Sequence, residues 1–250
     1  MADGIRVIER AVDILQAFTF DDSELSLAEI CEKVDLPKTT VFRIINTLEH
    51  QNFLDQNRQN GKYHLGYELI KLGEQAKNSN ELSRIAYEYM LAASEASKQT
   101  CNLYVKEGDE RLCIAQVTGS EYIRKHSYLG ARHPLYCGAG KLILAFERPQ
   151  VVDEYLSNVA LVKITENTIT DKEKLKEELE KIRNCGYAIS LGERDSISAS
   201  VAVPVFDYSK QLVAALTISG PLHDFTESGI HTYIDILKVQ AQKMSSKLGN

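Results

Sequence analysis

The sequence predicts a mixed α/β protein that begins with a winged helix-turn-helix over residues 1–66, continues through a linker helix over residues 67–80, and ends in an α+β domain over residues 81–250. Three observations support this organisation. Helix, turn, helix and hairpin signals follow one another between residues 26 and 66, a polar break lies at residues 77–80, and β-rich runs alternate with helical ones beyond it. A length of 250 residues is enough for two modest domains.

The first two predicted helices precede the turn of this motif. Residues 5–20 form an amphipathic pattern whose apolar side carries Ile8, Val12, Leu15 and Phe18. The next helix opens with Ser26 followed three positions later by Glu29, which is a capping box. Asp35-Leu36-Pro37 then ends that helix, and Pro37 suits the first turn of the following one.

The third predicted helix separates an apolar stripe from a polar face. The stripe consists of Val41, Ile44, Ile45 and Leu48. The opposite face carries Lys38, Thr39, Thr40, Arg43, Asn46 and Thr47. Hydroxyls, amides and cations in the N-terminal half of such a helix are the groups that enter the major groove of DNA. We therefore predict that this face reads double-stranded operator DNA.

A hairpin follows the third helix. Asn60-Gly61, between apolar runs ending at Leu54 and beginning at Tyr63, predicts a two-residue turn. Arg58 and Lys62 lie around its tip and have no acidic neighbour in sequence, so we expect both to contact phosphates.

The second half alternates helices with strands. Helices are expected over residues 82–98, 138–146 and 171–184, and from 226 onward. A second capping box, Thr170 with Glu173, is expected to open the third of these, whose charged face from 172 to 183 is interpreted as solvated surface. Strands are expected over residues 101–106, 111–117, 122–128, 187–191, 198–206 and 212–219, which predicts a largely antiparallel sheet.

Composition excludes several classes of protein. The net charge of −6 and the pI near 5.6 argue against a general nucleic-acid coat, while a local basic patch suffices for a specific regulator. No apolar run suits a membrane helix and the first ten residues do not resemble a signal peptide, so we expect a cytoplasmic protein without a membrane partner. The five cysteines lack metal-ligand spacing, and His223 and His231 are isolated, so neither a metal nor a cofactor is expected.

The chain resembles the IclR-type transcriptional regulators over nearly its whole length. The segments that carry the resemblance are residues 10–15, 36–43, 63–66, 138–145, 186–187, 203–207 and 218–221. The resemblance implies a winged helix, a linker helix and a GAF-like domain that binds a small effector. It also implies a homodimer or homotetramer, which in most members is a repressor.

The resemblance also implies where the effector binds. The matching positions are the amides of Gly138 and Ala139 at a helix start, with hydroxyls at Ser190, Ser200, Thr217 and Ser219. Unpaired amides at a helix start attract a carboxylate. Several family members carry an acidic residue where this chain has Ser190, a Cys where it has Ser200 and a Gly where it has Ile197. The resemblance thus implies a pocket lined by hydroxyls and without a carboxylate, which suits a hydroxylated or keto acid.

Two alternatives rest on Cys137. A cysteine beside a helix start and near His133 could be a nucleophile in a small-molecule enzyme, or the thiol of a redox-sensing regulator. No third orienting residue is evident for catalysis. A phosphate loop at Gly138 to Lys141 is excluded, because Leu135 and Leu142 stand where the P-loop needs Gly and Ser or Thr.

Overall fold

The computed structural model describes residues 4–119 and 128–249. It divides into two compact units, one ending at Ser79 and the other beginning at Asn80. The second unit begins there because the Asn80 side chain accepts a hydrogen bond from the Ser83 amide and caps a new helix. Each unit has its own apolar core.

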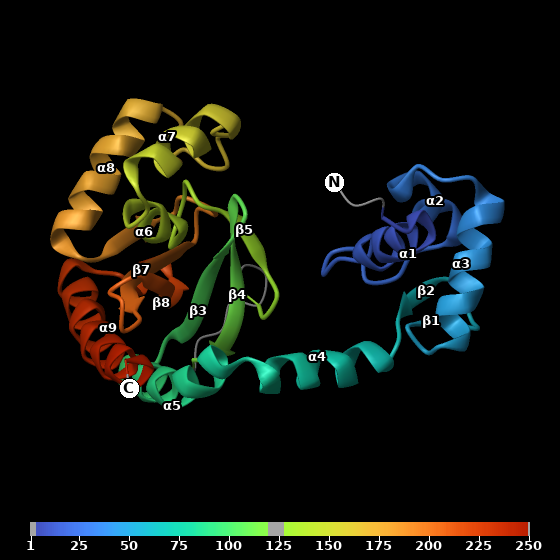
Figure 1. The fold of residues 1–250 in the computed structure, drawn as a ribbon, viewed down its shortest axis with the longest axis horizontal. Coiled ribbons are helices and arrows are strands. Elements are labelled where there is room, and N and C mark those ends of the chain that lie inside the picture. The colour runs from blue at the N-terminus through green and yellow to red at the C-terminus, as the bar shows by residue number, and fades with distance from the viewer. Residues whose placement is uncertain (1–3, 120–127, 250) are drawn as a thin grey trace. The chain divides into compact units, whose positions relative to one another are not determined.

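The N-terminal unit contains a winged helix-turn-helix, as predicted (Figure 1). Its elements are α1 (Arg6–Gln16), α2 (Leu27–Val34), α3 (Lys38–His50), β1 (Leu54–Gln56), β2 (Tyr63–Leu65) and α4 (Glu68–Ser79). The core that joins them includes Ile14, Ile30, Val41, Ile45 and Tyr63, all buried. The predicted stripe of α3 therefore faces this core.

The turn between α2 and α3 is built from local chemistry. Ser26 and Glu29 form the predicted capping box, with the Ser26 amide donating to Glu29 Oε2 at 2.7 Å. Asp35 ends α2 in the left-handed conformation at φ 48°. Pro37 is the N-cap of α3 and not part of its first turn, one residue earlier than predicted.

The wing is longer than the predicted two-residue turn. Gln56 pairs with Tyr63, and the Asn57 amide donates to the Lys62 carbonyl at 2.8 Å, which leaves residues 58–61 as the loop. Glu24 accepts hydrogen bonds from the side chains of Asn57 and Asn60 and holds this wider loop in place. The prediction of a two-residue turn is wrong because these side-chain bonds stabilise the longer one.

The apolar side of α1 is only partly buried. Ile14 and Phe18 face the core, whereas Ile8 and Val12 are 57% and 43% exposed. The helix ends at Gln16, short of the predicted Phe20. The core of this small unit covers only the C-terminal part of α1, so its first two turns keep apolar side chains on the surface.

The C-terminal unit is a six-stranded antiparallel sheet covered by helices, which confirms the predicted fold class. The strand order is β5-β4-β3-β8-β7-β6. The strands are β3 (Thr100–Glu107), β4 (Glu110–Val117), β5 (Arg132–Pro134), β6 (Ala188–Leu191), β7 (Ser198–Phe206) and β8 (Leu212–Pro221).

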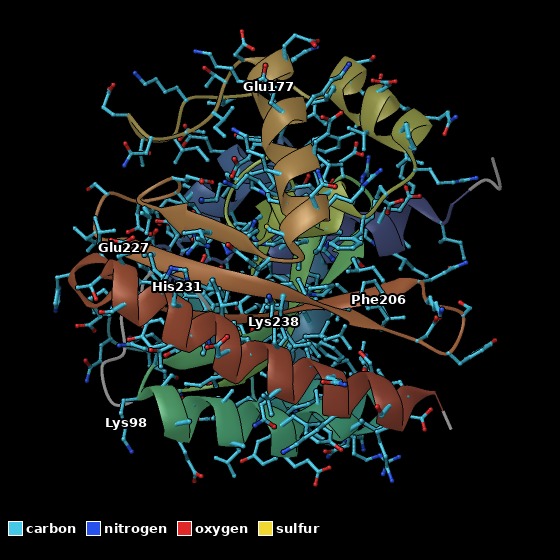
Figure 2. The ribbon with its side chains drawn as sticks, turned by 90° about the vertical axis from the view of Figure 1, so that its left-hand side faces the viewer. Lys98, Glu177, Phe206, Glu227, His231 and Lys238 are labelled. Atoms are coloured by element: carbon cyan, nitrogen blue, oxygen red, sulfur yellow. The ribbon has the colours of Figure 1, made fainter. Side chains whose placement is uncertain are left out.

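Helices cover both faces of this sheet. They are α5 (Glu81–Ser97), α6 (Gly140–Ala145), α7 (Pro149–Asn158), α8 (Lys172–Cys185) and α9 (Glu227–Leu248), with a 3-10 turn at Leu222–Asp224. Figure 2 shows the sheet between α8, labelled at Glu177, and the pair formed by α5 and α9. Among the described residues, no helix combines the length and apolarity needed to cross a membrane.

Several predicted elements of this unit need correction. The α6 helix begins at Gly140, because Gly138 adopts φ +59° and stays outside it. The cap of α8 is Asp171, whose side chain accepts from the Lys174 amide, and not Thr170. The strand predicted at 122–128 falls mostly outside the described residues. The sequence analysis missed β5 and α7, although Pro149 at the start of α7 is a helix signal.

The two sheet faces have different chemistry, and this difference places the site. One face packs apolar residues such as Leu103, Val201 and Leu216 against α5 and α9. The opposite face meets the core that contains α6, α7 and α8, and polar side chains occupy part of it.

Candidate functional site

The predicted DNA-reading face of α3 is on the surface. Lys38, Thr39, Arg43 and Thr47 are exposed, and Thr40 and Asn46 are half-buried. The Thr47 hydroxyl donates to the Arg43 carbonyl at 3.1 Å, so only its lone pairs remain for another donor. Arg43 has no protein partner among the described residues, which leaves its whole guanidinium for a base edge or a phosphate.

A groove of about 590 Å³ separates α3 from the start of α1. Thr39, Thr40, Arg43 and Thr47 line its α3 side, and Arg10 lines its α1 side. Arg10 was not among the predicted DNA contacts. Phe42, which is 46% exposed on α3, was not among them either. An apolar side chain at that position can contact a thymine methyl group.

The start of α3 is also suited to an anion. Its N-cap is Pro37, which provides no side-chain hydrogen bond to the first amides of this 13-residue helix. Helix-start amides without a cap bind phosphate oxygens. The adjacent Lys38 and Thr39 side chains are exposed and add a cation and a hydroxyl there.

The two wing cations differ in their surroundings. Arg58 is exposed at the tip of the wing. Lys62 is half-buried and lies 3.3 Å from Glu29 Oε2 of α2, a partner 33 positions away in the sequence. The hydrogen bond from the Ser26 backbone, with help from the Ser26 side chain and Lys62, lowers the pKa of Glu29 to about 2. Lys62 therefore also joins the wing to α2.

The structure brings the four predicted effector hydroxyls together. Ser190, Ser200 and Ser219 are register partners across β6, β7 and β8. Thr217 is two residues from Ser219 on β8, so its side chain points to the same face of the sheet. The register therefore makes a continuous hydroxyl surface from segments far apart in the chain.

Two amide side chains extend this surface and were missed by the sequence analysis. Asn102 of β3 donates to the Ser219 hydroxyl at 2.9 Å, and Thr217 donates to the Asn102 carbonyl at 3.3 Å. Gln116 of β4 donates to Asn102 Oδ1 at 2.8 Å. Asn102 is fully buried, yet its place in an alternating strand gave no sign of this role.

The predicted anion site at the start of α6 contains a carboxylate of the protein itself. The Gly138 amide donates to Glu193 Oε2 at 2.9 Å, and Lys141 Nζ lies 2.5 Å from Glu193 Oε1. The expectations of an unpaired Gly138 amide and of a pocket without a carboxylate are therefore wrong. Lys141, whose side chain is 1% exposed, also contacts Glu178 at 3.1 Å. The Ala139 amide stays a predicted contact.

Arg111 lies beside the cluster formed by Lys141, Glu178 and Glu193 and is buried. Its guanidinium donates to the carbonyls of Pro134 and Cys137 and lies 5.1 Å from the centre of the Tyr104 ring. A side chain at Gly138 would come within 2.9 Å of Arg111 Nη2, so the glycine makes room for the guanidinium. Arg111 Nε is buried and, among the described residues, lacks a hydrogen-bond partner.

Arg194 is the second arginine of this region. It follows Glu193 in the loop before β7 and contacts His133 Nε2 of β5. Burial, followed by the charge of Arg111, lowers the pKa of Arg194, against the opposing effects of Tyr104 and Asp195. His133 is the register partner of Arg111 across β4 and β5, so its contact with Arg194 brings the two arginines into one region. No sequence pattern marked either arginine, because they are 83 positions apart.

Cys137 does not have the properties of a reactive thiol. It is fully buried, and burial raises its pKa against the lowering effect of Arg111. His133, its neighbour in sequence, contacts Arg194. A reactive cysteine needs access and a lowered pKa, so neither the nucleophile nor the redox interpretation is supported.

The fold and these two surfaces define a class of protein: a DNA-binding transcriptional regulator with a separate ligand-binding domain. Comparison with known proteins agrees. Residues 7–58 match the model of the IclR helix-turn-helix domain, and residues 74–246 match that of the bacterial transcriptional regulator IclR C-terminal domain. The chain belongs to the IclR family of transcriptional regulators.

Individual relatives cover the whole chain. The HTH-type transcriptional regulator KdgR of Escherichia coli is 31% identical over 99% of this chain and 94% of its own length. The solved IclR of Thermotoga maritima is 34% identical with a TM-score of 0.79, covering 99% of this chain and 100% of that one. An IclR homologue of Microbacterium hydrocarbonoxydans, solved with 4-hydroxybenzoate, is 24% identical with a TM-score of 0.82, covering 97% and 98%.

Proposed function

We propose that this regulator represses transcription as a homodimer or homotetramer, and that a small organic acid on the polar sheet face controls its binding to a palindromic operator. The observation that carries the proposal is the second surface, a row of polar side chains on one face of the sheet of which Asn102, Ser190 and Thr217 are buried. Structural cores do not need such a set of polar groups.

The reading head is proposed to bind through α3 and the wing. Lys38, Thr39, Thr40, Arg43, Asn46 and Thr47 would contact the major groove, and Arg58 and Lys62 the phosphates. Titration of the DNA that flanks the protein's own gene in a mobility-shift assay tests this function. Specific binding at nanomolar protein, with weaker binding to a scrambled duplex, is expected. Equal binding to both duplexes would contradict it.

Self-association is proposed to occur through α1 and α4. In α1 and the residue before it, Ile5, Val7 and Ile8 are 64%, 59% and 57% exposed. No residue of α4 is buried, and its Ile70 is 64% exposed. Exposed apolar side chains on two helices are typical of an interface when they come together in an apolar patch. Sedimentation should give a dimer or tetramer at micromolar concentration, and a monomer with full operator affinity would contradict the proposal.

The effector is proposed to be a hydroxylated or keto acid whose oxygen bonds to Ser190, Ser200, Thr217 or Ser219. The homologue solved with 4-hydroxybenzoate supports a ligand of this class. Ser200→Val and Ser219→Ala should each weaken binding of the organic acid that gives the strongest operator response by about 1–3 kcal/mol, measured by calorimetry. Unchanged affinity in both variants would place the ligand elsewhere. Linkage requires operator DNA to change effector affinity by the same factor.

Catalysis is not part of the proposed function, and no cofactor or metal is assigned. The buried Cys137, with its raised pKa, supports a packing role. Peroxide treatment should therefore leave operator affinity unchanged, and loss of binding that a reductant reverses would restore the redox alternative. We propose that the protein works in the cytoplasm, where its operator DNA would be.

A further inference from the structure

The occupied anion site at α6 raises the question of what binds the acid group of an effector. The Gly138 amide already donates to Glu193, and α6 has only six residues. Lys141 is also committed, since its ammonium group contacts both Glu193 and Glu178. A ligand carboxylate that entered here would have to displace the carboxylate of Glu193. The six-residue helix offers a ligand no advantage over Glu193.

Arg111 offers a different receptor for an acid. It is 3% exposed, and a single guanidinium nitrogen, Nη1, donates to the carbonyls of Pro134 and Cys137. Its Nε is buried without a protein partner among the described residues. A buried donor without a partner costs about 1–3 kcal/mol, so this nitrogen gains by receiving an acceptor from a ligand. The stacking on Tyr104 keeps the guanidinium plane in place.

Arg194 supplies a second guanidinium to the same region. Its pKa is lowered by burial and by the charge of Arg111, which means that the two cations destabilise one another in the unliganded protein. Asp195 is the acidic residue whose charge opposes this effect.

We propose that Arg111 and Arg194 together bind the carboxylate of the effector, an organic acid whose polar tail lies over Asn102 and Thr217. The inference rests on the proposed function, because it concerns the ligand of the same sheet face. A planar carboxylate matches the fork of a guanidinium and brings negative charge to both cations. An uncharged analogue of the same shape leaves both arginines unneutralised.

The test compares simple carboxylates with an uncharged analogue on the full chain. Thermal unfolding is followed in acetate, pyruvate or 4-hydroxybenzoate as sodium salts, against sodium chloride at equal ionic strength and against 4-hydroxybenzamide. At least one carboxylate is expected to raise the Tm with saturation, and the amide to leave it unchanged. If none of the three carboxylates stabilises the protein, or if the amide matches its acid, the proposal is wrong.

Substitutions assign the effect to the two arginines. Arg194→Gln should raise the half-saturating concentration of the active carboxylate at least about ten-fold, the cost of one charge-assisted bond. Arg132→Gln is the matched control, since Arg132 lies on β5 beside His133 but is exposed and paired with Glu107. Arg111→Gln tests the other guanidinium in the same way. Because Arg111 also binds two carbonyls, the fold of this variant is checked by circular dichroism. Unchanged half-saturation in Arg194→Gln overturns the proposal even where Arg111→Gln fails to fold.

Operator titrations separate this inference from the proposed function. If an organic acid changes operator affinity equally in the parent and in Arg194→Gln, the arginine assignment is wrong and the regulatory function stands. If carboxylates bind through the arginines but no duplex is bound specifically, the proposed function is wrong and the anion site stands.

Discussion

The DNA-reading surface and the polar sheet face are built in opposite ways. The first lies within residues 26–66, and its chemistry is exposed on one helix and one hairpin. The second collects side chains from residue 102 to residue 219, and several of them are buried. Exposed cations stay solvated until a partner arrives, whereas buried ones need partners inside the protein. Substitutions of Arg43 and Arg58 in the first, which are exposed and unpaired among the described residues, should change binding alone, and substitutions in the second should change folding as well.

The largest effect is expected for the buried ion pair between Lys141 and Glu193. Lys141→Ala leaves Glu193, whose side chain is 9% exposed, without its cation. Removing one member of a buried ion pair costs about 3–5 kcal/mol, so the free energy of unfolding should fall by that amount. Urea unfolding of the full chain measures it. A loss below about 1 kcal/mol would show that the sheet-face charges behave like surface ones and would break the comparison.

The reading helix should show a smaller effect and only on binding. Arg43→Ala removes an exposed guanidinium, and loss of a bidentate contact with a base costs about 1–3 kcal/mol. Operator affinity should fall about ten-fold or more while the Tm stays that of the parent. Unchanged affinity in a mobility-shift titration would show that α3 is not the reading helix, and Lys98→Ala in the other unit is a control far from it in sequence.

The two wing cations sharpen the comparison within one surface. Arg58→Ala should reduce the salt dependence of operator binding by about one unit and weaken specific and non-specific duplexes alike. Lys62→Ala should do the same and in addition lower stability slightly, because Lys62 pairs with Glu29. Salt titrations and urea unfolding of both variants separate the effects. Equal stability of the two variants would mean that the Lys62–Glu29 pair contributes nothing.

The smallest effect concerns acid and the start of α2. The pKa of Glu29 is about 2 in the folded protein and near 4.5 without its hydrogen bonds. A lowered folded pKa stabilises α2 above pH 4.5, and this stabilisation is lost as the pH falls towards 2. The protection of amides 27–34 from hydrogen exchange, measured relative to their intrinsic rates, should therefore fall at pH 3 more in the parent than in Glu29→Gln. Ser26→Ala should cost about 1 kcal/mol at pH 7. Identical acid responses in the parent and in Glu29→Gln would show that the ionised Glu29 carboxylate does not stabilise α2.

The sequence by itself determined the helix-turn-helix, because its signals are local. The Ser26–Glu29 box, the break before Pro37 and the stripe from Val41 to Leu48 each act within a few residues. The same locality explains why most strands were predicted, because successive side chains of a strand alternate between the two faces of the sheet. Local reasoning failed where distant side chains decide, as in the wing loop, where Glu24 binds Asn57 and Asn60.

Only the tertiary structure decided the chemistry of the sheet face. Strand register alone brings Ser190, Ser200 and Ser219 into one row. The approach of the Glu193 loop to α6 fills the amide that the sequence left open, and the same loop sets Arg194 near Arg111. These contacts join residues tens of positions apart, and a periodicity read along the chain carries no information about which distant charges will share a buried space.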